Sequence, residues 1–233
     1  MQLMVQKEVA VPGPVPKRHP MPFARLEIAV LGLIDGELQV LLARRAQAPY
    51  AGKWALPGGV LRIDLDASLD AAAGRVMHER LGLDLPFLRQ LGATGGPTRD
   101  PRSPWALSIV YRALVPAERI SFQAGKRIEA LAWRRADTVI ADGGLAFDHA
   151  ALVARAVEAT RAEVEQLDLP AGLLPDPFTL GELQVACEQV LGHRLDKSSF
   201  RRKLADRQVV EPLEGAMRTG ANRPAQIYRL RAR

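Results

Sequence analysis

Residues 54–83, which read WALPGGVLRIDLDASLDAAAGRVMHERLGL, decide the fold of the first half of the chain. The second half of this stretch predicts a helix over about Ser68–Leu81, and Gly82 is the type of residue that ends a helix. Ahead of the helix stands Gly58-Gly59, a pair that by itself is more often a turn than a phosphate-binding loop. The stretch therefore reads as a loop followed by one well-bounded helix.

Strand-like segments surround this stretch. Residues 25–34 and 37–44 are rich in β-forming residues and flank the pair Asp35-Gly36, which predicts a β-hairpin. Two further strand-like runs cover Trp105–Val115 and Ile128–Trp133. Strands of this kind with few, segregated helices predict an α+β domain built on a mixed β-sheet.

The composition is that of an ordinary globular protein. The chain has 233 residues, 48% of them hydrophobic, and a formal net charge of +6. Its longest apolar run, residues 28–34, is too short to span a bilayer, and the first residues lack the pattern of a secretion signal. The lone Cys187 cannot form an intrachain disulfide and fits a reducing compartment. We therefore expect a cytoplasmic protein with no membrane segment.

The stretch 54–83 resembles the catalytic box of the Nudix family. The family pattern is Gly, five residues, Glu, seven residues and then Arg-Glu-U-x-Glu-Glu-x-Gly-U, where U is a bulky aliphatic residue. Arg75, Met77, Gly82 and Leu83 occupy the positions that this pattern gives to Arg, U, Gly and U. In that family, carboxylates on one helix face hold divalent ions against a diphosphate, so the resemblance implies a diphosphate-binding fold.

Most of the metal-binding carboxylates of this pattern are replaced. Val76 and Arg80 stand in the first and third Glu positions of the helix, and Glu79 alone is retained. The upstream loop is two residues longer than the pattern, so the remaining Glu position falls on Leu65 or Ala67. A cation about 4 Å from a metal ion opposes it by on the order of 4 kcal/mol per charge pair. We therefore expect a domain that binds a nucleoside diphosphate compound without hydrolysing it, and neither a metal nor a cofactor.

Basic residues near the box are candidates for contacting phosphate groups. The segment Thr98–Arg102, TRDPR, places two arginines around an Asp-Pro turn, and guanidinium groups match phosphate oxygens bidentately. The alternative is a solvated turn held by an Arg–Asp bond, just as Arg75 and Glu79 could form an ordinary ion pair. The candidate effector-binding residues are Arg44, Arg45, Gly58, Gly59, Arg62, Glu79, Arg80, Arg99, Asp100 and Arg102.

The chain changes character after residue 148. Residues 150–167 have apolar positions at helical spacing and no strand signal, and a Pro/Gly-rich segment follows them. At the other end, five prolines among residues 1–22 indicate a flexible arm. The expected division is an arm over residues 1–22, a Nudix-like domain over 23–148, a linker helix and loop over 149–175, and a DNA-binding domain over 176–233.

The last segment predicts two helices and a closing strand pair. Thr179 and Glu182 form a capping-box pair at the start of the first helix, and Gly192 follows its end. Asp196 is the N-cap of the second helix. This order of elements is the outline of a winged helix-turn-helix domain.

The second of these helices has a basic outward face that suits insertion into a DNA major groove. Residues 194–233 hold 11 Lys+Arg and 4 Asp+Glu, so the net positive charge of the chain is concentrated there. The alternative for any single basic run is an ordinary solvated helix face. The candidate DNA-binding residues are Lys197, Ser198, Ser199, Arg201, Arg202 and Lys203 on the helix, and Arg218, Asn222 and Arg223 on the wing.

From Phe23 to Leu230 the chain resembles the Nudix-related transcriptional regulators of NAD metabolism. The motifs that carry this resemblance are WALPGGVLRID, TRDPR, LAFDHA, LLPDPFTLGELQ, LDKSSFRRKL and RPAQIYRL, in that order. It implies a homodimeric repressor that binds double-stranded DNA at a palindromic operator and senses ADP-ribose or a related nucleotide. Three alternatives stay open: a sugar-responsive regulator, an active Nudix hydrolase, and a nucleic-acid-binding scaffold without ligand sensing.

Overall fold

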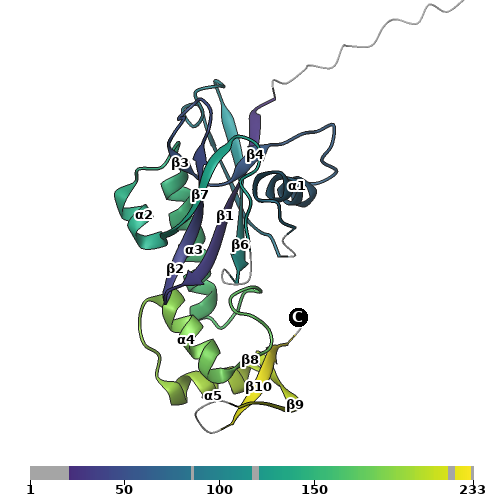
Figure 1. The fold of residues 1–233 in the computed structure, drawn as a ribbon, viewed down its shortest axis with the longest axis vertical. Helices are drawn as coiled ribbons and strands as arrows, with labels where there is room; N and C mark the ends of the chain where they lie inside the picture. Colours follow the sequence, from purple (N-terminus) through teal and green to yellow (C-terminus); the bar gives the residue numbers. More distant parts are fainter. Residues whose placement is uncertain (1–20, 85–86, 117–120, 220–223, 232–233) are drawn as a thin grey trace, which may run out of the picture.

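The computed structural model describes residues 21–84, 87–116, 121–219 and 224–231. Figure 1 shows a larger sheet with helices on both faces in the upper part of the molecule, and a smaller helical region with a short sheet beneath it. No helix in the described ranges combines the length and the apolar character that crossing a membrane requires.

The larger sheet is built around β1 (Phe23–Ile34), which pairs in parallel with β6 (Ala106–Val115) and antiparallel with β2 (Glu37–Arg45). The other strands found in the described residues are β3 (Trp54–Ala55) and β7 (Ile128–Arg135) beside β2, β4 (Gly58–Val60) beside β1, and β5 (Arg89–Gly96) beside β6. Parallel and antiparallel pairs occur together, so the predicted mixed sheet and α+β class are confirmed.

The turn between β1 and β2 has the chemistry that the sequence predicts. Asp35 and Gly36 have φ values of 50° and 80°, and Ile34 pairs with Glu37 across the two-residue loop. Positive φ at both loop positions matches the twist of the flanking strands, and Asp-Gly adopts it at low cost. The hairpin prediction is confirmed.

Helix α1 (Leu69–Leu81) is the helix predicted from residues 68–81. The Ser68 side chain accepts a hydrogen bond from the backbone N–H of Ala71 at 3.1 Å, which satisfies one of the free donors of the first turn. Gly82 ends the helix with a φ of 69° and donates its N–H to the His78 carbonyl.

The two faces of the sheet are covered by different helices. Leu26 and Ile28 of β1 pack with α1, whereas Leu31, on the opposite face, packs with the C-terminal helices. The strand period of two therefore also places Arg25 and Glu27 on the face opposite α1. That second face is covered by α2 (Ala136–Asp142) and α3 (His149–Glu165).

The C-terminal region has the predicted winged-helix order of elements. Helices α4 (Leu180–Leu191) and α5 (Lys197–Arg207) are followed by a small sheet in which β10 (Ala225–Leu230) lies between β8 (Phe178–Thr179) and β9 (Val210–Arg218). Thr179 and Glu182 form both hydrogen bonds of the capping box, and Asp196 accepts from the Ser199 N–H at 2.8 Å. All three caps predicted here, with Gly192 at φ 77°, are confirmed.

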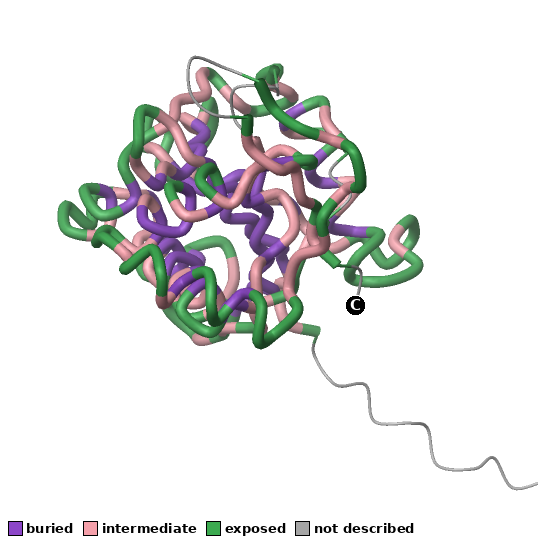
Figure 2. The backbone as a smooth tube through the Cα atoms, turned by 90° about the horizontal axis from the view of Figure 1, so that it is seen from below, coloured by how far each residue is buried: buried purple, intermediate pink, exposed green. Residues whose placement is uncertain are grey.

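One hydrophobic core runs through both regions. Val157 and Val164 of α3 belong to the same buried cluster as Leu183 and Val190 of α4. In Figure 2 the buried segments gather along the middle of the molecule, and exposed loops surround them. The winged helix is therefore packed on the sheet-containing region and is not tethered to it by the chain alone.

Five elements of the described residues were not predicted from the sequence: the short strands β3, β4 and β8, the strand β5 and the helix α2. Strand β5 has the glycine-rich sequence RQLGATGG, which shows no alternation of apolar and polar residues, and α2 is only seven residues long. The predicted helix over residues 150–167 begins one residue earlier and ends two residues earlier. The predicted domain boundaries stay predictions, and the arm falls almost entirely outside the described residues.

Candidate functional site

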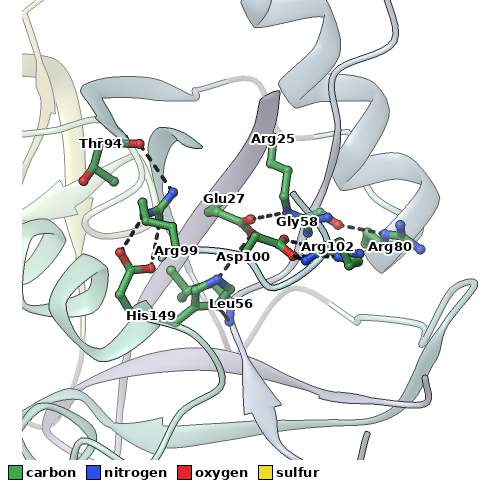
Figure 3. A network of polar contacts seen from close by, with 11 residues as sticks. Arg25, Glu27, Leu56, Gly58, Arg80, Thr94, Arg99, Asp100, Arg102 and His149 are labelled. Atoms are coloured by element: carbon green, nitrogen blue, oxygen red, sulfur yellow. Dashed lines mark hydrogen bonds and ion pairs between the residues drawn. The ribbon is translucent and has the colours of Figure 1, made fainter. Parts of the chain in front are cut away.

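Arginine side chains from distant segments line one pocket at an end of the larger sheet. Its guanidinium groups come from the starts or ends of strands, from α1, from the TRDPR loop and from the segment before β7; we call it the arginine pocket. Its arginines are Arg25, Arg44, Arg45, Arg80, Arg102 and Arg127. Figure 3 shows Arg25, Arg80 and Arg102 converging beside Gly58.

Three of the six arginines have a carboxylate partner. These pairs are Arg25 with Glu27 at 2.8 Å, Arg44 with Glu129 at 2.9 Å, and Arg102 with Asp100 at 2.8 Å. Each carboxylate cancels the charge of its arginine and fixes the direction of its guanidinium group. Such pairs hold side chains in place without adding net positive charge to the pocket.

The other three arginines lack a carboxylate partner among the described residues. Arg45 donates to the Pro49 carbonyl at 2.7 Å. Arg80 donates to the Gly58 carbonyl at 3.0 Å and to that of Lys126. The backbone carbonyl of Arg127 accepts from the Ala46 N–H at 3.1 Å, but its guanidinium has no hydrogen bond or ion pair with any described residue. Three positive charges therefore converge on the pocket without a direct ion pair to a described carboxylate, although Glu27 acts on both Arg45 and Arg80 at longer range.

The environment of these guanidinium groups favours an incoming anion. Burial lowers the pKa of Arg45, and the nearby charges of Arg25 and Arg102 lower it further. Burial likewise lowers the pKa of Arg80, with Arg127 and Arg25 as additional causes. Both shifts mean that desolvation and repulsion between the arginines destabilise the charged forms of these side chains. A bound anion would offset both effects.

Gly58 forms part of the pocket floor, and only glycine fits there. A Cβ atom at this position would lie 1.9 Å from a carboxylate oxygen of Glu27 and 2.6 Å from the Leu26 carbonyl oxygen. The close approach places the Gly58 carbonyl where Arg80 can bond to it. Gly58 therefore leaves room for the buried Glu27 carboxylate on one side and accepts a hydrogen bond from Arg80 on the other.

The segment Phe147-Asp148-His149 ties the start of α3 to the pocket walls. Arg99 forms two hydrogen bonds with Asp148, at 2.6 and 2.7 Å. The backbone N–H of Leu56 donates to Nδ1 of His149 at 2.9 Å, so His149 carries its proton on Nε2. Burial lowers the pKa of His149, and the imidazole is neutral at neutral pH.

Aromatic rings form one wall beside the arginines. The ring of Phe147 stacks on His149 at 5.1 Å, and the guanidinium of Arg45 lies 4.9 Å from its centroid. Tyr50 contacts the same ring edge to face at 4.8 Å and is 45% exposed. Phe147 and Tyr50 both have positive φ values, 57° and 62°, which non-glycine residues adopt rarely.

The structure divides the predicted effector-binding residues into two groups. Those that line the arginine pocket are Arg44, Arg45, Gly58, Arg80 and Arg102, and Asp100 holds Arg102 in place. Arg62 pairs with Asp64, Glu79 with Arg75, Arg99 with Asp148, and Gly59 packs against Val76, so these four lie outside the lining.

Sequence reasoning missed Arg25, Arg127 and Tyr50. Arg25 could have been found from the sequence, because Arg25 and Glu27 place two charges on one face of an otherwise apolar strand. Arg127 and Tyr50 lie in loops, where no periodic pattern marks a functional side chain.

The residues at the former metal positions do not fit a divalent cation. Val76 is fully buried against the sheet, Arg80 points into the arginine pocket, and Glu79 is paired with Arg75 at 3.2 Å. Asp66, which matched neither register of the family pattern, accepts two hydrogen bonds from Arg75. Within the described parts of the chain, no group of three or more His, Cys, Asp or Glu side chains is placed to hold a metal ion.

The basic face of α5 lies open to solvent. Phe200 and Leu204 are buried, and the cations on the other side of the helix are exposed. Ser198 is exposed among them, and Ser199 is half-buried in the first turn. The exposed cations of this face are Lys197, Arg201, Arg202 and Lys203, whereas Arg207, which is also exposed, donates to the Gln166 carbonyl.

The predicted wing residue Arg218 differs from the exposed cations of α5 because its side chain has protein partners. Arg218 pairs with Glu182 and donates to the Pro177 carbonyl at 3.1 Å, so its guanidinium points toward the start of α4. The predicted DNA contacts Asn222 and Arg223 lie outside the described residues.

Each of the two parts of the chain matches a known protein family. A NUDIX domain model matches residues 24–156, and a model of the NrtR DNA-binding winged helix domain matches residues 170–230. The chain is 36% identical to the ADPR responsive transcriptional repressor NtrR of Acinetobacter baylyi over 213 residues, which is 91% of this chain and 83% of that protein.

Two solved structures of a Shewanella oneidensis protein are also similar. The crystal structure of NrtR complexed with a 27mer DNA matches with a TM-score of 0.72 and 29% identity, over 89% of this chain and 93% of that one. The NUDIX domain of the same NrtR, complexed with ADP ribose, matches with a TM-score of 0.56 and 28% identity, over 63% and 94%. With a Nudix fold, an NrtR-type winged helix and this full-length similarity, the chain belongs to the NrtR family of transcriptional regulators.

Proposed function

We propose that this protein is a repressor of NAD-metabolism genes whose affinity for operator DNA changes when ADP-ribose, or a closely related nucleoside diphosphate, binds the arginine pocket. The relatives support both halves of this function, because one is a repressor that responds to ADP-ribose and another was solved with DNA and, as its Nudix domain, with ADP ribose.

The three uncompensated cations of the arginine pocket carry the proposal for the effector. Arg45, Arg80 and Arg127 supply positive charge that no carboxylate of the described residues neutralises. A diphosphate linking two sugars carries two negative charges, and guanidinium groups bind its oxygens by charge-assisted hydrogen bonds. An uncharged sugar would leave this charge unpaired, which disfavours the sugar-responsive alternative.

The same residues support a binding function without hydrolysis. Nudix-type hydrolysis needs metal-bound carboxylates, and here a buried valine, a paired glutamate and a pocket arginine stand in their places. Arg80 instead brings its own positive charge to the phosphates. We therefore propose that effector binding needs no metal or other cofactor.

The winged helix supplies the DNA-binding half of the function. Helix α5 presents four exposed cations on one side of two buried anchors, Phe200 and Leu204. This arrangement suits a recognition helix, in which central residues meet base edges and flanking cations meet phosphates. A homodimer would present two such helices to the two halves of a palindromic operator in cytoplasmic DNA.

Selection of bound fragments from total genomic DNA, with and without ADP-ribose, tests the whole function. We expect one sequence class to be enriched, and its recovery to change by about ten-fold or more with ADP-ribose, as is common for coupled sites. Enrichment that is insensitive to the nucleotide would favour a DNA-binding scaffold. No enrichment at all would reject the regulator.

A second assay addresses hydrolysis. The purified protein is incubated with ADP-ribose and magnesium, and AMP release is followed by chromatography. We expect no release above that of a protein-free control, whereas calorimetry in the presence of a chelator should still detect ADP-ribose binding. Metal-dependent turnover would instead favour an active hydrolase.

A further inference from the structure

Helix α3 begins at the arginine pocket and ends against the winged helix. Its first residue, His149, is bonded to Leu56, which lines the pocket. The preceding Phe147 lies under two pocket arginines, with Arg45 at 4.9 Å and Arg102 at 5.8 Å from its ring centroid. Arg45 and Arg102 are among the side chains that an anion would draw toward itself, so pocket occupancy acts directly on the residues that start α3.

The last turns of α3 are bonded to the winged helix. Arg161 donates from Nε to the carbonyl of Val190, near the end of α4, at 2.9 Å. Its terminal nitrogen also binds both oxygens of Asp137 in α2, at 2.8 and 3.1 Å. Just beyond α3, the Gln166 carbonyl accepts a hydrogen bond from Arg207 of α5. The far end of α3 therefore contacts both helices of the DNA-binding domain.

Between these ends α3 is a regular helix with a buried face. Residues 149 and 161 are separated by twelve positions, or about 18 Å along the axis. Ala156, Val157 and Thr160 are almost fully buried, and Arg112 pairs with Glu163 at 2.9 Å. A packed helix moves as a unit, by sliding or rotating 1–2 Å, more readily than it bends.

Helix α4 has space to follow such a movement. A cleft of about 590 Å³ between the two regions is lined by Arg161 and Asp137, and a second cleft of about 470 Å³ is lined by Leu33 and Leu174. Both clefts are bordered by Val185 and Gln189 of α4. Open space therefore adjoins α4 where it meets the sheet region.

From this geometry we propose that α3 transmits effector occupancy to the DNA-binding domain, and that Arg161 is the positioning residue that couples α3 to α4. Binding in the pocket biases the position of α3, and the Arg161–Val190 bond passes this bias to α4 and so to the recognition helix α5. An effector shifts DNA affinity only if it binds one of the two arrangements more tightly. This inference rests on the proposed function.

The test measures the operator Kd by fluorescence anisotropy with and without saturating ADP-ribose, in the full-length protein. The ratio of the two values is the coupling factor, which typically lies between 5- and 150-fold. In Arg161→Ala we expect this factor to fall to about two-fold or less, because the bond to α4 is lost. ADP-ribose binding by calorimetry should stay within about three-fold of wild type, since Arg161 is remote from the pocket.

Arg155→Ala is the matched control. Arg155 lies on the same helix and donates to the Leu91 carbonyl at 2.7 Å, so it loses the same kind of bond within the sheet region alone. Its coupling factor should equal that of wild type. Arg161→Met is a second variant in case Arg161→Ala unfolds, because it keeps the length of the side chain but has no group to donate to the Val190 carbonyl, and the same fall in the factor is expected.

Hydrogen exchange adds a readout that a loss of general stability would not reproduce. ADP-ribose should change amide protection in α4 of wild type and of Arg155→Ala, but not in Arg161→Ala. A wild-type coupling factor in Arg161→Ala, or in Arg161→Met where the first variant does not fold, would overturn the inference. If wild type bound ADP-ribose without any change in DNA affinity, the proposed function would fail first, and this inference with it.

Discussion

At the scale of single residues, Arg80 changes the character of the Nudix box most. It stands where the family pattern has a metal-binding glutamate, and its side chain reaches into the arginine pocket and bonds to Gly58. In the proposed function, this cation takes the place of the charge that a metal ion would bring to a diphosphate. The exchange would then keep anion binding and remove a ligand of the metal ion that activates water in hydrolysis.

Arg80→Ala should weaken ADP-ribose binding by about ten-fold or more, because a charge-assisted hydrogen bond of about 1.5–3 kcal/mol is lost. Calorimetry without metal measures the effect. Arg62→Ala is the control: Arg62 was also predicted from the sequence to bind the effector, but it pairs with Asp64 outside the pocket. Equal loss in both variants would mean that the pocket is wrongly placed.

Gly58→Ala should destabilise the fold by about 2–3 kcal/mol, because the new Cβ would overlap Glu27 and the backbone of Leu26. Thermal unfolding followed by circular dichroism measures this. Gly74→Ala in α1 is a useful contrast, since nothing lies within 4 Å of a Cβ there and alanine favours a helix interior by about 1 kcal/mol. A melting temperature of Gly58→Ala at or above that of wild type would contradict the account of the pocket floor.

At the scale of elements, local chemistry allowed most helices and the central hairpin to be predicted. Ser68–Leu81, the Thr179 capping box and the Asp35-Gly36 turn are each specified by a few adjacent residues, so a single sequence suffices. Strand β5 was missed because its glycines carry no alternation and its place depends on pairing with β6.

The candidate site was harder to predict than the elements. Its arginines come from segments as far apart as residues 25 and 127, and their convergence is set by strand pairing. Sequence reasoning proposed arginines but could not tell that Arg99 turns toward Asp148 while Arg102 reaches the pocket. Which arginines keep a carboxylate partner is likewise a property of the folded chain.

The start of α3 should make the stability of the protein depend on pH. Burial lowers the pKa of His149 below the 6.5 of a free histidine, and the charged groups around it are Glu27, Arg25, Asp148 and Arg99. Between these two pKa values, His149 is protonated in the unfolded chain but neutral in the folded chain. The stability that this group contributes is complete above about pH 6.5 and is lost as the pH falls toward its folded pKa, by up to about 1.4 kcal/mol per pH unit.

Thermal melts between about pH 7.5 and pH 5.5 check this expectation. The fall in melting temperature should be smaller in His149→Gln, which cannot take up the proton but keeps an acceptor for the Leu56 N–H. His193→Gln removes an exposed histidine and should behave like wild type. The same pH dependence in all three proteins would show that other groups dominate acid unfolding.

At the scale of the whole molecule, the C-terminal region and the rest of the chain differ in net charge. Residues 194–233 carry 11 Lys+Arg against 4 Asp+Glu, whereas the rest of the chain is nearly balanced. Within that balanced part six arginines line the arginine pocket, and the carboxylates beside them, Glu27 and Asp100, are already paired. The molecule thus has two separate cationic surfaces, the arginine pocket and the basic face of α5, and a continuous core joins the two regions.

The DNA-facing surface should show its phosphate contacts in the salt dependence of operator binding. Each contact contributes about 0.9 to the slope of log K against log salt, so Arg202→Ala should lower the slope by about 0.9 for each protomer that loses a contact. Arg218→Ala should change it less, because Arg218 is held by Glu182 at the start of α4. Anisotropy titrations over a range of potassium chloride concentrations measure both slopes, and ADP-ribose binding should be unaffected in both variants. A larger loss of slope in Arg218→Ala would mean that the wing leaves Glu182 on binding and that backbone contacts there outweigh those of α5.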